Sequence, residues 1–264
     1  MKELILRTLT GISLIIIVMG SILLGPVPFL GVTLLVYGLS LNELFSVYHR
    51  GKVLPRMVMA VSAGSLLPLT FAVLQHQWSP LWLILPAAFW IIGFLWSGFI
   101  VAGTLILFWL AIPFTSFYAL GWIGEMNAYH PIFPLSILAL VWINDTFAYV
   151  VGSLLGKHKM TPRLSPGKTW EGFVGGILFT LLAGWIIFRI FGQYILGNWI
   201  WFSLIIGSLG LLGDLFESSL KRKMNVKNMG GLLPGHGGIL DRFDSLLFVA
   251  PALLTLMVLI KLLQ

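Results

Sequence analysis

Long apolar stretches follow one another along most of the chain, separated by short segments rich in proline, glycine or charge. A helix needs about 20 mainly apolar residues to cross the roughly 30 Å hydrocarbon layer of a bilayer. Spanning strands would have to alternate and close into a barrel, and no such alternation is visible. The pattern therefore predicts an all-α polytopic integral membrane protein with about nine transmembrane helices, at 4–24, 27–47, 54–74, 80–97, 100–122, 132–154, 172–192, 197–219 and 245–263.

Two of these boundaries need a further argument. The break at Ser97-Gly98 is the least distinct, because residues 80–122 are almost continuously apolar. The first stretch resembles a secretory leader, but it is long and is followed by GPVPFL instead of a small-x-small cleavage site. We interpret it as a retained first span.

The composition supports a membrane protein. Of the 264 residues, 58% are hydrophobic and only 9% are charged, whereas soluble domains carry about 25% charged residues. The absence of cysteine excludes disulfides and Cys-based metal sites. A net charge of +7 favours anionic partners. Because the charges lie in short loops between apolar spans, no nucleic acid partner is expected.

The basic residues predict the orientation of the helices. With nine spans and a cytoplasmic N-terminus, all 16 Lys and Arg except Arg189 and Lys261 fall on the inside, as the positive-inside rule expects. The chain is therefore expected to be a multi-pass protein of the inner (cytoplasmic) cell membrane. Region 1–130 has few polar groups, whereas region 131–264, with cytoplasmic loops 155–171 and 220–244, carries nearly all the chemistry.

Four aspartates are candidates for a metal site. A carboxylate at the centre of a span costs about 2.5–3.5 kcal/mol and marks a functional site by default. The topology places Asp145, Asp214, Asp241 and Asp244 in the cytoplasmic half of the membrane, where they can converge and repel one another. A divalent cation resolves this repulsion, and oxygen ligands suit Mg²⁺. Asp214 and Asp241 are the strongest candidate ligands, and Asp145 and Asp244 come second.

Structural alternatives stay open for these carboxylates. Asp214, Glu217 and Lys221 share one helix face and could form an ion-pair ladder. Asp145 could serve only to hydrogen-bond a neighbouring helix. For Glu43 and Glu217 a structural role is favoured over a catalytic one.

The loop GGLLPGHGG can bring its backbone close to a ligand, because glycine lacks a Cβ, and its N–H groups precede a helix. Metal, amide donors and cations together indicate a polyphosphate site. Two alternatives remain: KRK could be a membrane anchor, and Asp241 and Asp244 could only neutralise the following helix end. The candidate phosphate-binding residues in and around this loop are Lys221, Arg222, Lys227, His236, Gly237 and Arg242.

The other loop reads GKHKMTPRLSPGKTWEG. Ser165 is expected to cap the following helix, with Pro166 at its first position. Lys168 would then lie in the first turn, where the helix dipole disfavours a cation unless an anion is near. The S-x-x-K match lacks its companion motifs, and Pro162 replaces the first glycine of a phosphate loop, so neither motif applies.

The segment SSLKRKMNVKNMGGLLPGHGGILDRFD resembles the signature of the phosphatidate cytidylyltransferases, also called CDP-diacylglycerol synthases. NDTFAYVVGSLLGKHK and LSPGKTWEG are similar to a second block of that family, so the resemblance covers residues 142–176 and 214–246. This chain has Asn228 where the family usually has Asp. Either this position is not a required ligand, or metal binding is weakened.

The resemblance implies a nucleotidyltransferase that moves the cytidylyl group of CTP to phosphatidic acid, releasing pyrophosphate. It implies Mg²⁺, with a second cation left open, a homodimer, and membrane lipid around the site. The implied catalytic residues are Asp145, Asp214, Asp241, Asp244 and Lys227. The implied substrate-binding residues are Ser165, Lys168, Thr169, Lys221, Arg222, His236, Gly237 and Arg242.

Other classes of protein share some of these features. A cation-coupled transporter also carries intramembrane carboxylates, but near the midplane and within inverted repeats. A CTP-dependent kinase of a long-chain lipid alcohol would release CDP. A headgroup transferase would need D-x2-D-G-x2-A-R, which the sequence lacks.

Overall fold

The computed structural model describes residues 2–47, 53–76, 78–97, 100–123, 128–191, 199–235 and 237–263. Within these ranges each of the nine predicted spans corresponds to one helical passage. Six passages are single helices: α1 (Lys2–Leu24), α2 (Pro26–Val47), α8 (Ile132–Leu155), α9 (Trp170–Phe191), α10 (Trp199–Lys223) and α11 (Leu240–Leu263). The others are α3 (Val53–Gly64) with α4 (Leu66–His76), η1 (Pro80–Leu83) with α5 (Ile84–Ser97), and α6 (Ile100–Thr104) with η2 (Leu105–Ala111), α7 (Ile112–Ala119) and η3 (Leu120–Trp122).

The helical membrane fold is confirmed. Among the described residues, seven of these passages are long and apolar enough to cross a membrane. The shorter apolar helices are Thr8–Leu24 and Pro80–Leu95. The number of crossings and the side of the N-terminus stay predictions.

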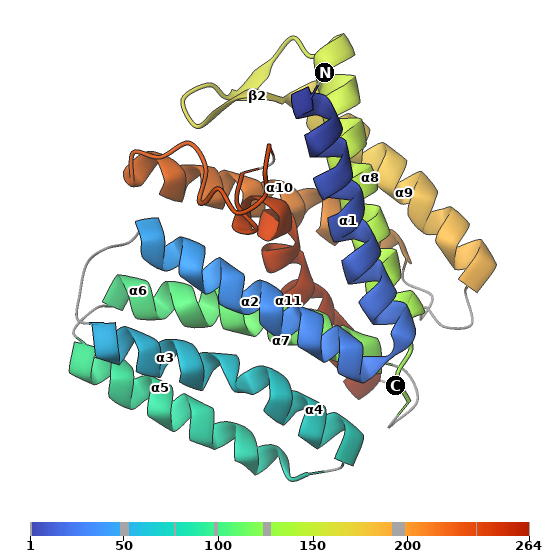
Figure 1. Cartoon of the computed structure of the whole chain (residues 1–264). Helices are drawn as coiled ribbons and strands as arrows, with labels where there is room; N and C mark the ends of the chain where they lie inside the picture. The colour runs from blue at the N-terminus through green and yellow to red at the C-terminus, as the bar shows by residue number, and fades with distance from the viewer. Residues whose placement is uncertain are drawn as a thin grey trace.

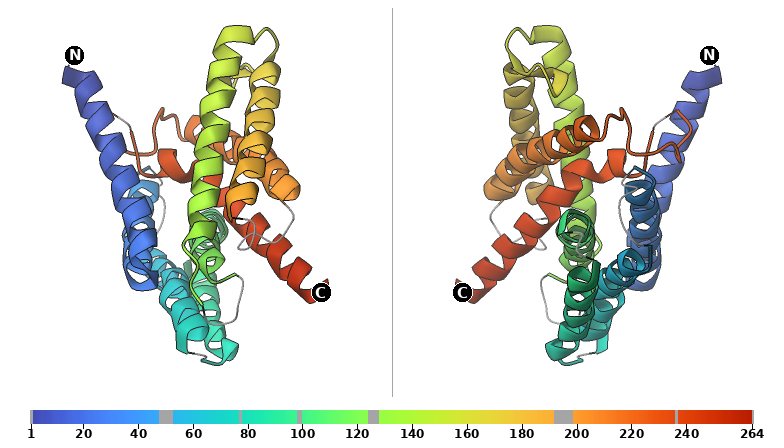
Figure 2. Two further views of the ribbon diagram at one scale, coloured as in Figure 1. Left: turned by 90° about the vertical axis from the view of Figure 1, so that its right-hand side faces the viewer. Right: turned by 90° about the vertical axis from the view of Figure 1, so that its left-hand side faces the viewer.

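The helices form two groups that meet at α10 and α11. Figure 1 shows α2 to α7 stacked beside one another, with α8 and α9 standing as a separate pair. Helix α10 packs on both α9 and α11, and α11 packs on α7. In Figure 2, α1 lies on one side of α8 and the C-terminal end of α11 leaves on the other. The division of the chain at residue 130 stays a prediction, and the contact of α7 with α11 joins its two parts.

Glycines bring α8 and α9 into close contact. A Cβ at Gly172 would lie 2.5 Å from the Ala148 carbonyl oxygen, and one at Gly176 would lie 2.9 Å from Asn144 Oδ1. Small residues at such positions let membrane helices approach closely. The pair is also held by Phe147 and Phe179, whose rings stack with centroids 3.7 Å apart.

A two-stranded hairpin joins α8 to α9. Strand β1 (Lys159–Thr161) pairs antiparallel with β2 (Ser165–Thr169), with Thr161 opposite Ser165. The prediction that Ser165 caps the next helix is therefore wrong, because strand pairing holds it in β2. Thr169 is the cap instead, since its Oγ1 accepts a hydrogen bond from the Gly172 N–H at 3.1 Å. Lys168 accordingly lies in β2 and not in the first helical turn.

Both helices beside the glycine-rich loop are longer than predicted. Helix α10 continues to Lys223 and α11 begins at Leu240, so the predicted loop 220–244 is shortened to 224–239. The early start of α11 has a clear cause. The Glu43 carboxylate accepts hydrogen bonds from the N–H groups of Ile239 and Leu240 at 2.8 and 2.9 Å. These bonds satisfy donors that a helix start otherwise leaves free.

Candidate active site

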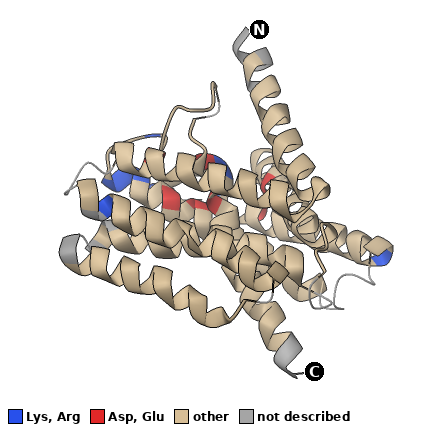
Figure 3. Ribbon diagram, turned by 60° about the horizontal axis from the view of Figure 1, so that its bottom comes forward, with Lys and Arg blue, Asp and Glu red and all other residues tan. Residues whose placement is uncertain are grey.

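A cavity of about 630 Å³ opens between α8, α9, α10, the hairpin and the start of α11. The structure thus brings together residues that are far apart in the sequence and that were predicted to act together. Figure 3 shows the acidic positions gathered inside the bundle. The predicted site residues that line the cavity are Asp145, Asp214, Asp241, Asp244, Ser165, Lys168 and Thr169.

Asp214 forms an ion pair with a lysine of the hairpin. Lys168 Nζ lies 2.5 Å from Asp214 Oδ2, and the Ser218 hydroxyl donates to Oδ1 at 3.2 Å. The alternative of a ladder along α10 is therefore wrong for Asp214, although Lys221 does pair with Glu217 at 3.2 Å. The side chain of Asp214 keeps 35% of its surface exposed, so it remains accessible from the cavity.

Asp145 and Asp244 complete the open part of the acidic cluster. Asp145 accepts a long hydrogen bond of 3.4 Å from its own neighbour Asn144, and it also interacts with the side chain of Ser245 on α11. Asp244 accepts from the Ser245 N–H at 2.7 Å. Asp214 and Asp145 both interact electrostatically with Asp244. The three carboxylates therefore face a shared space in which they repel one another.

Asp241 has a different environment from the other aspartates. It accepts hydrogen bonds from the N–H groups of Gly238 at 2.8 Å and Met229 at 3.3 Å, and from Lys221 Nζ at 2.8 Å. Its side chain is only 8% exposed. It thus caps the start of α11 and fixes the glycine-rich loop to α10. Metal ligation by Asp241 stays a prediction, beside this role in positioning the loop.

Glu43 is the residue whose role the sequence shows least clearly. It is 2% exposed and holds the start of α11 from α2. A Cβ on either Gly230 or Gly238 would lie within 2.6 Å of its carboxylate oxygens, so only glycine leaves room for it there. The sequence did contain a signal for this role, because a carboxylate near the end of a membrane span needs hydrogen-bond donors. Its partners could not be identified without the fold.

None of the predicted phosphate-binding residues in and around the glycine-rich loop that the structure describes lines the first cavity. Lys221 Nζ forms ion pairs with the carboxylates of Glu217 and Asp241. Arg222 and Lys227 are exposed and line neither of the two polar cavities. Gly237 adopts φ 84°, which favours glycine, and its carbonyl accepts from the Leu233 N–H at 2.9 Å. His236 lies outside the described residues.

Lys159 and Asn144 are among the residues of the cavity wall that were not predicted. Lys159 of β1 lines the cavity beside Lys168, and the basic KHK segment was its only signal in the sequence. Asn144 lines it next to Asp145 and also meets Thr180, whose hydroxyl donates to Asn144 Oδ1 at 3.4 Å. Nothing in the spacing of the sequence marks that contact between α8 and α9.

A second cavity, of about 400 Å³, lies on the other side of the acidic cluster, between α1, α8 and α11. It shares Asp145, Asp241 and Asp244 with the first cavity, and Arg242 lines it. Asn228 lines neither cavity. A Cβ at Gly237 would nevertheless lie 2.9 Å from Asp241 Oδ2 and 3.4 Å from Asn228 Cγ, so Asn228 is near a predicted ligand and both alternatives for position 228 stay predictions.

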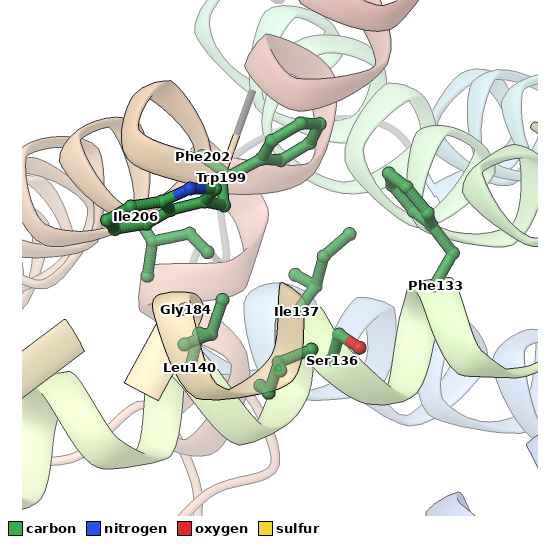
Figure 4. Close-up of a pocket in the computed structure, with 9 residues that line it drawn as sticks. Phe133, Ser136, Ile137, Leu140, Gly184, Trp199, Phe202 and Ile206 are labelled. Carbon is green, nitrogen blue, oxygen red and sulfur yellow. The ribbon is translucent and has the colours of Figure 1, made fainter. Parts of the chain in front are cut away.

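A third pocket is apolar and separate from the acidic cluster. Figure 4 shows it between α8, α9 and α10, towards the ends of these helices remote from the hairpin. The hydroxyl of Ser136 donates to the Ile132 carbonyl of its own helix at 2.7 Å. The pocket therefore offers packing and no chemistry. It is lined by Phe133, Ser136, Ile137, Leu140, Gly184, Ile187, Trp199, Phe202 and Ile206.

The donor set of the first cavity fits a divalent cation. Four aspartates line it, and the ammonium groups that pair with them are those of Lys168 and Lys221. Carboxylate oxygens in excess over cations are the environment that Mg²⁺ prefers, and Mg²⁺ usually keeps several water ligands. No three His, Asp or Glu side chains in the described part of the chain form a ready-made cage. An ion here would therefore be held by few side chains and by water or substrate oxygens.

Comparisons with known proteins agree with these features. A phosphatidate cytidylyltransferase of Staphylococcus haemolyticus is 43% identical over 152 residues, which are 57% of this chain and 56% of that protein. Those of Staphylococcus saprophyticus and Staphylococcus aureus are 48% and 47% identical over 121 residues, 45% of this chain and 46% of each relative. The matches thus span about half the length of these relatives. The model of the cytidylyltransferase family matches residues 5–260. The chain belongs to the cytidylyltransferase family.

Proposed function

We propose that the protein transfers the cytidylyl group of CTP to phosphatidic acid, giving CDP-diacylglycerol and pyrophosphate, as a step of phospholipid biosynthesis. The observation that carries this proposal is the single cavity in which four aspartates from three apolar helices meet Lys168 of the hairpin. The names of the relatives support the substrates.

The residues of the cavity suit this chemistry. The attacking lipid phosphate is already an anion, so the reaction needs positioning and charge neutralisation more than a general base. Asp145, Asp214 and Asp244 would hold Mg²⁺, which when bound neutralises the charge of the phosphates. Lys168 and Lys159 place positive charge on the hairpin side, where the polyphosphate would lie. Asp241 and Glu43 keep the glycine-rich loop in place.

We further propose that the site faces the cytoplasm from the inner membrane. The distribution of Lys and Arg supports this orientation. CTP is a cytoplasmic nucleotide, and the phosphate of phosphatidic acid lies at the membrane surface. A cavity at the hairpin end of the helices can reach both. The homodimer and the second cation implied by the resemblance belong to the same proposal.

The decisive experiment is turnover by the purified protein. Labelled CTP and phosphatidic acid in mixed micelles should give labelled lipid and an equal amount of pyrophosphate with Mg²⁺, and no product with EDTA. Release of CDP with a phosphorylated alcohol would support the kinase alternative. Absence of transfer, together with cation flux in liposomes, would support the transporter.

Lys168→Ala should weaken the use of CTP. The change removes the cation that lies 2.5 Å from Asp214 in the cavity, so KM for CTP should rise about tenfold with a smaller change in KM for the lipid. The magnitude corresponds to the loss of one charge-assisted hydrogen bond of about 1.5–3 kcal/mol. Arg163→Ala is the matched control, because Arg163 is exposed in the hairpin turn and does not line the cavity. Equal KM values for the two variants would remove Lys168 from the site.

A further inference from the structure

We propose that Glu171, in the first turn of α9, is a positioning residue that fixes the hairpin so that Lys159 and Lys168 lie at the first cavity. The proposal rests on the proposed function, because the two lysines contribute to the reaction only if an anionic substrate meets them there. Glu171 does not itself line the cavity. It would therefore act through the lysines and not on the reacting atoms.

The hairpin needs support from outside its own two strands. In the part of the chain that the structure describes, its sheet consists of β1 and β2 alone, and an isolated two-stranded hairpin is marginally stable at best in water. Its turn residues Pro162 and Arg163 are exposed. The positions of Lys159 and Lys168 therefore depend on how the base of the hairpin is attached to α8 and α9.

Glu171 binds the two residues that lead from α8 into β1. Its Oε2 accepts hydrogen bonds from the N–H groups of Lys157 at 3.1 Å and of His158 at 3.2 Å. Its Oε1 lies 2.6 Å from His158 Nδ1, and since a carboxylate can only accept, the ring nitrogen carries the hydrogen. The Trp170 N–H also donates to the His158 carbonyl at 3.0 Å. The residue before Lys159 is thus held through its N–H, its carbonyl and its ring.

A second contact fixes the end of β2. Thr169 lies opposite Lys159 in the pairing of the strands and is only 3% exposed. A Cβ at Gly152 would lie 3.0 Å from the Thr169 hydroxyl oxygen, and one at Gly156 would lie 2.7 Å from it. These glycines at the end of α8 therefore leave the space that Thr169 fills. Thr169 holds the end of β2, and Glu171 holds the start of β1.

The position of the hairpin decides where its positive charge lies. Lys168 Nζ meets Asp214 of α10, and Lys159 lines the same cavity. A hairpin that moves would place these ammonium groups at the cavity for only a fraction of the time. The apparent affinity for an anionic substrate falls by that fraction. Glu171 should therefore affect the binding of CTP without touching it.

Glu171→Ala should raise the KM for CTP about tenfold and leave the KM for phosphatidic acid within about twofold, as expected when the binding-competent state falls to about a tenth of the molecules. Lys157→Ala is the matched control, because it keeps the N–H that Glu171 binds, and its side chain is exposed and lines neither polar cavity. It should change the KM for CTP less than about twofold, since an exposed charge contributes little. Equal KM values for CTP in the two variants would overturn the proposal.

A double-mutant cycle separates positioning from a general loss of structure. If Glu171 acts through the lysines, Glu171→Ala should raise the KM for CTP by a smaller factor in the Lys168→Ala protein than in the wild type, because one of the groups that it positions is already gone. A merely structural role would give the same factor in both backgrounds. That result would contradict the proposal.

The hairpin can also be followed without turnover, which separates this proposal from the proposed function. The sequence has no cysteine, so Arg163→Cys gives a single site for a nitroxide label at the exposed turn. Label mobility and hydrogen exchange over residues 157–169 should rise with Glu171→Ala and stay at the parent level with Lys157→Ala. Unchanged mobility and exchange would exclude the positioning role even in an active enzyme. A mobile hairpin in a protein that transfers no cytidylyl group would contradict the reaction and keep Glu171 as the residue that positions the hairpin.

Discussion

Asp214→Asn should lower the rate of cytidylyl transfer about 10²- to 10³-fold, the range found when one preorganised electrostatic group is removed from an active site. Asp214 is the aspartate that meets Lys168 of the hairpin, and it stays partly open to the cavity. The amide keeps the size of the side chain but loses the charge that would attract a metal ion. Turnover should be measured over a range of Mg²⁺ concentrations, because a weakened ligand should shift the requirement upwards.

The control for this variant removes a neighbour of the same carboxylate. Ser218→Ala deletes one hydrogen bond of 3.2 Å to Asp214 Oδ1 and leaves the charge in place. Its effect should stay below about tenfold, in line with a neutral hydrogen bond of about 0.5–1.5 kcal/mol. An Asp214→Asn protein that melts normally and turns over like the Ser218→Ala protein would remove Asp214 from the catalytic set.

Glu43→Gln should both destabilise the protein and slow the reaction, although Glu43 lines neither of the two polar cavities. Its two oxygens accept from two consecutive N–H groups at the start of α11. Glutamine offers one oxygen and turns an NH₂ group towards the other donor. A buried donor left unsatisfied costs about 1–3 kcal/mol, and release of the loop that Asp241 holds should lower turnover about 10- to 100-fold.

The melting temperature in detergent and hydrogen exchange over residues 229–240 measure this effect. Ser46→Ala is the comparison, because the Ser46 hydroxyl donates to the Glu43 carbonyl within its own helix, at 2.8 Å, and not to the carboxylate. It should melt close to the wild type. Unchanged exchange of the loop in Glu43→Gln would show that the carboxylate does not fix it.

The sequence predicts the helices well because the bilayer imposes their length. Each predicted span has a helical counterpart among the described residues. The predicted break at Ser97-Gly98 stays a prediction, because residues 98–99 lie outside the described ranges. The errors lie where side chains from other parts of the chain decide the local structure. Strand pairing to Thr161 keeps Ser165 out of the helix, and Glu43 starts α11 at Leu240. The contact of Glu43 joins residues 196 apart, so no window of sequence contains it. The pairing of Thr161 with Ser165 is local, but the Ser-Pro sequence gives the stronger signal of a helix start.

The sequence identified which aspartates and which hairpin residues form the candidate site. It did not specify how these side chains are arranged around the cavity. Depth in the membrane was enough to place Asp145, Asp214, Asp241 and Asp244 together, and they line one cavity. The different surroundings of Asp241 depend on the path of the glycine-rich loop, which its spacing does not specify. The separation of Lys168 from Arg242 depends on where α1 lies, and α1 carries no motif.

The close pairing of α8 and α9 has a consequence for the surrounding lipid. Gly172 and Gly176 leave no space between these helices, and the hairpin joins their ends, so Lys168 moves with the pair as one body. Transmembrane helices adjust their tilt to bilayer thickness. A change in tilt of this pair relative to α10 alters the approach of Lys168 to Asp214. We therefore expect the rate of the proposed transfer to depend on the thickness of the host membrane, independently of how much substrate that membrane contains.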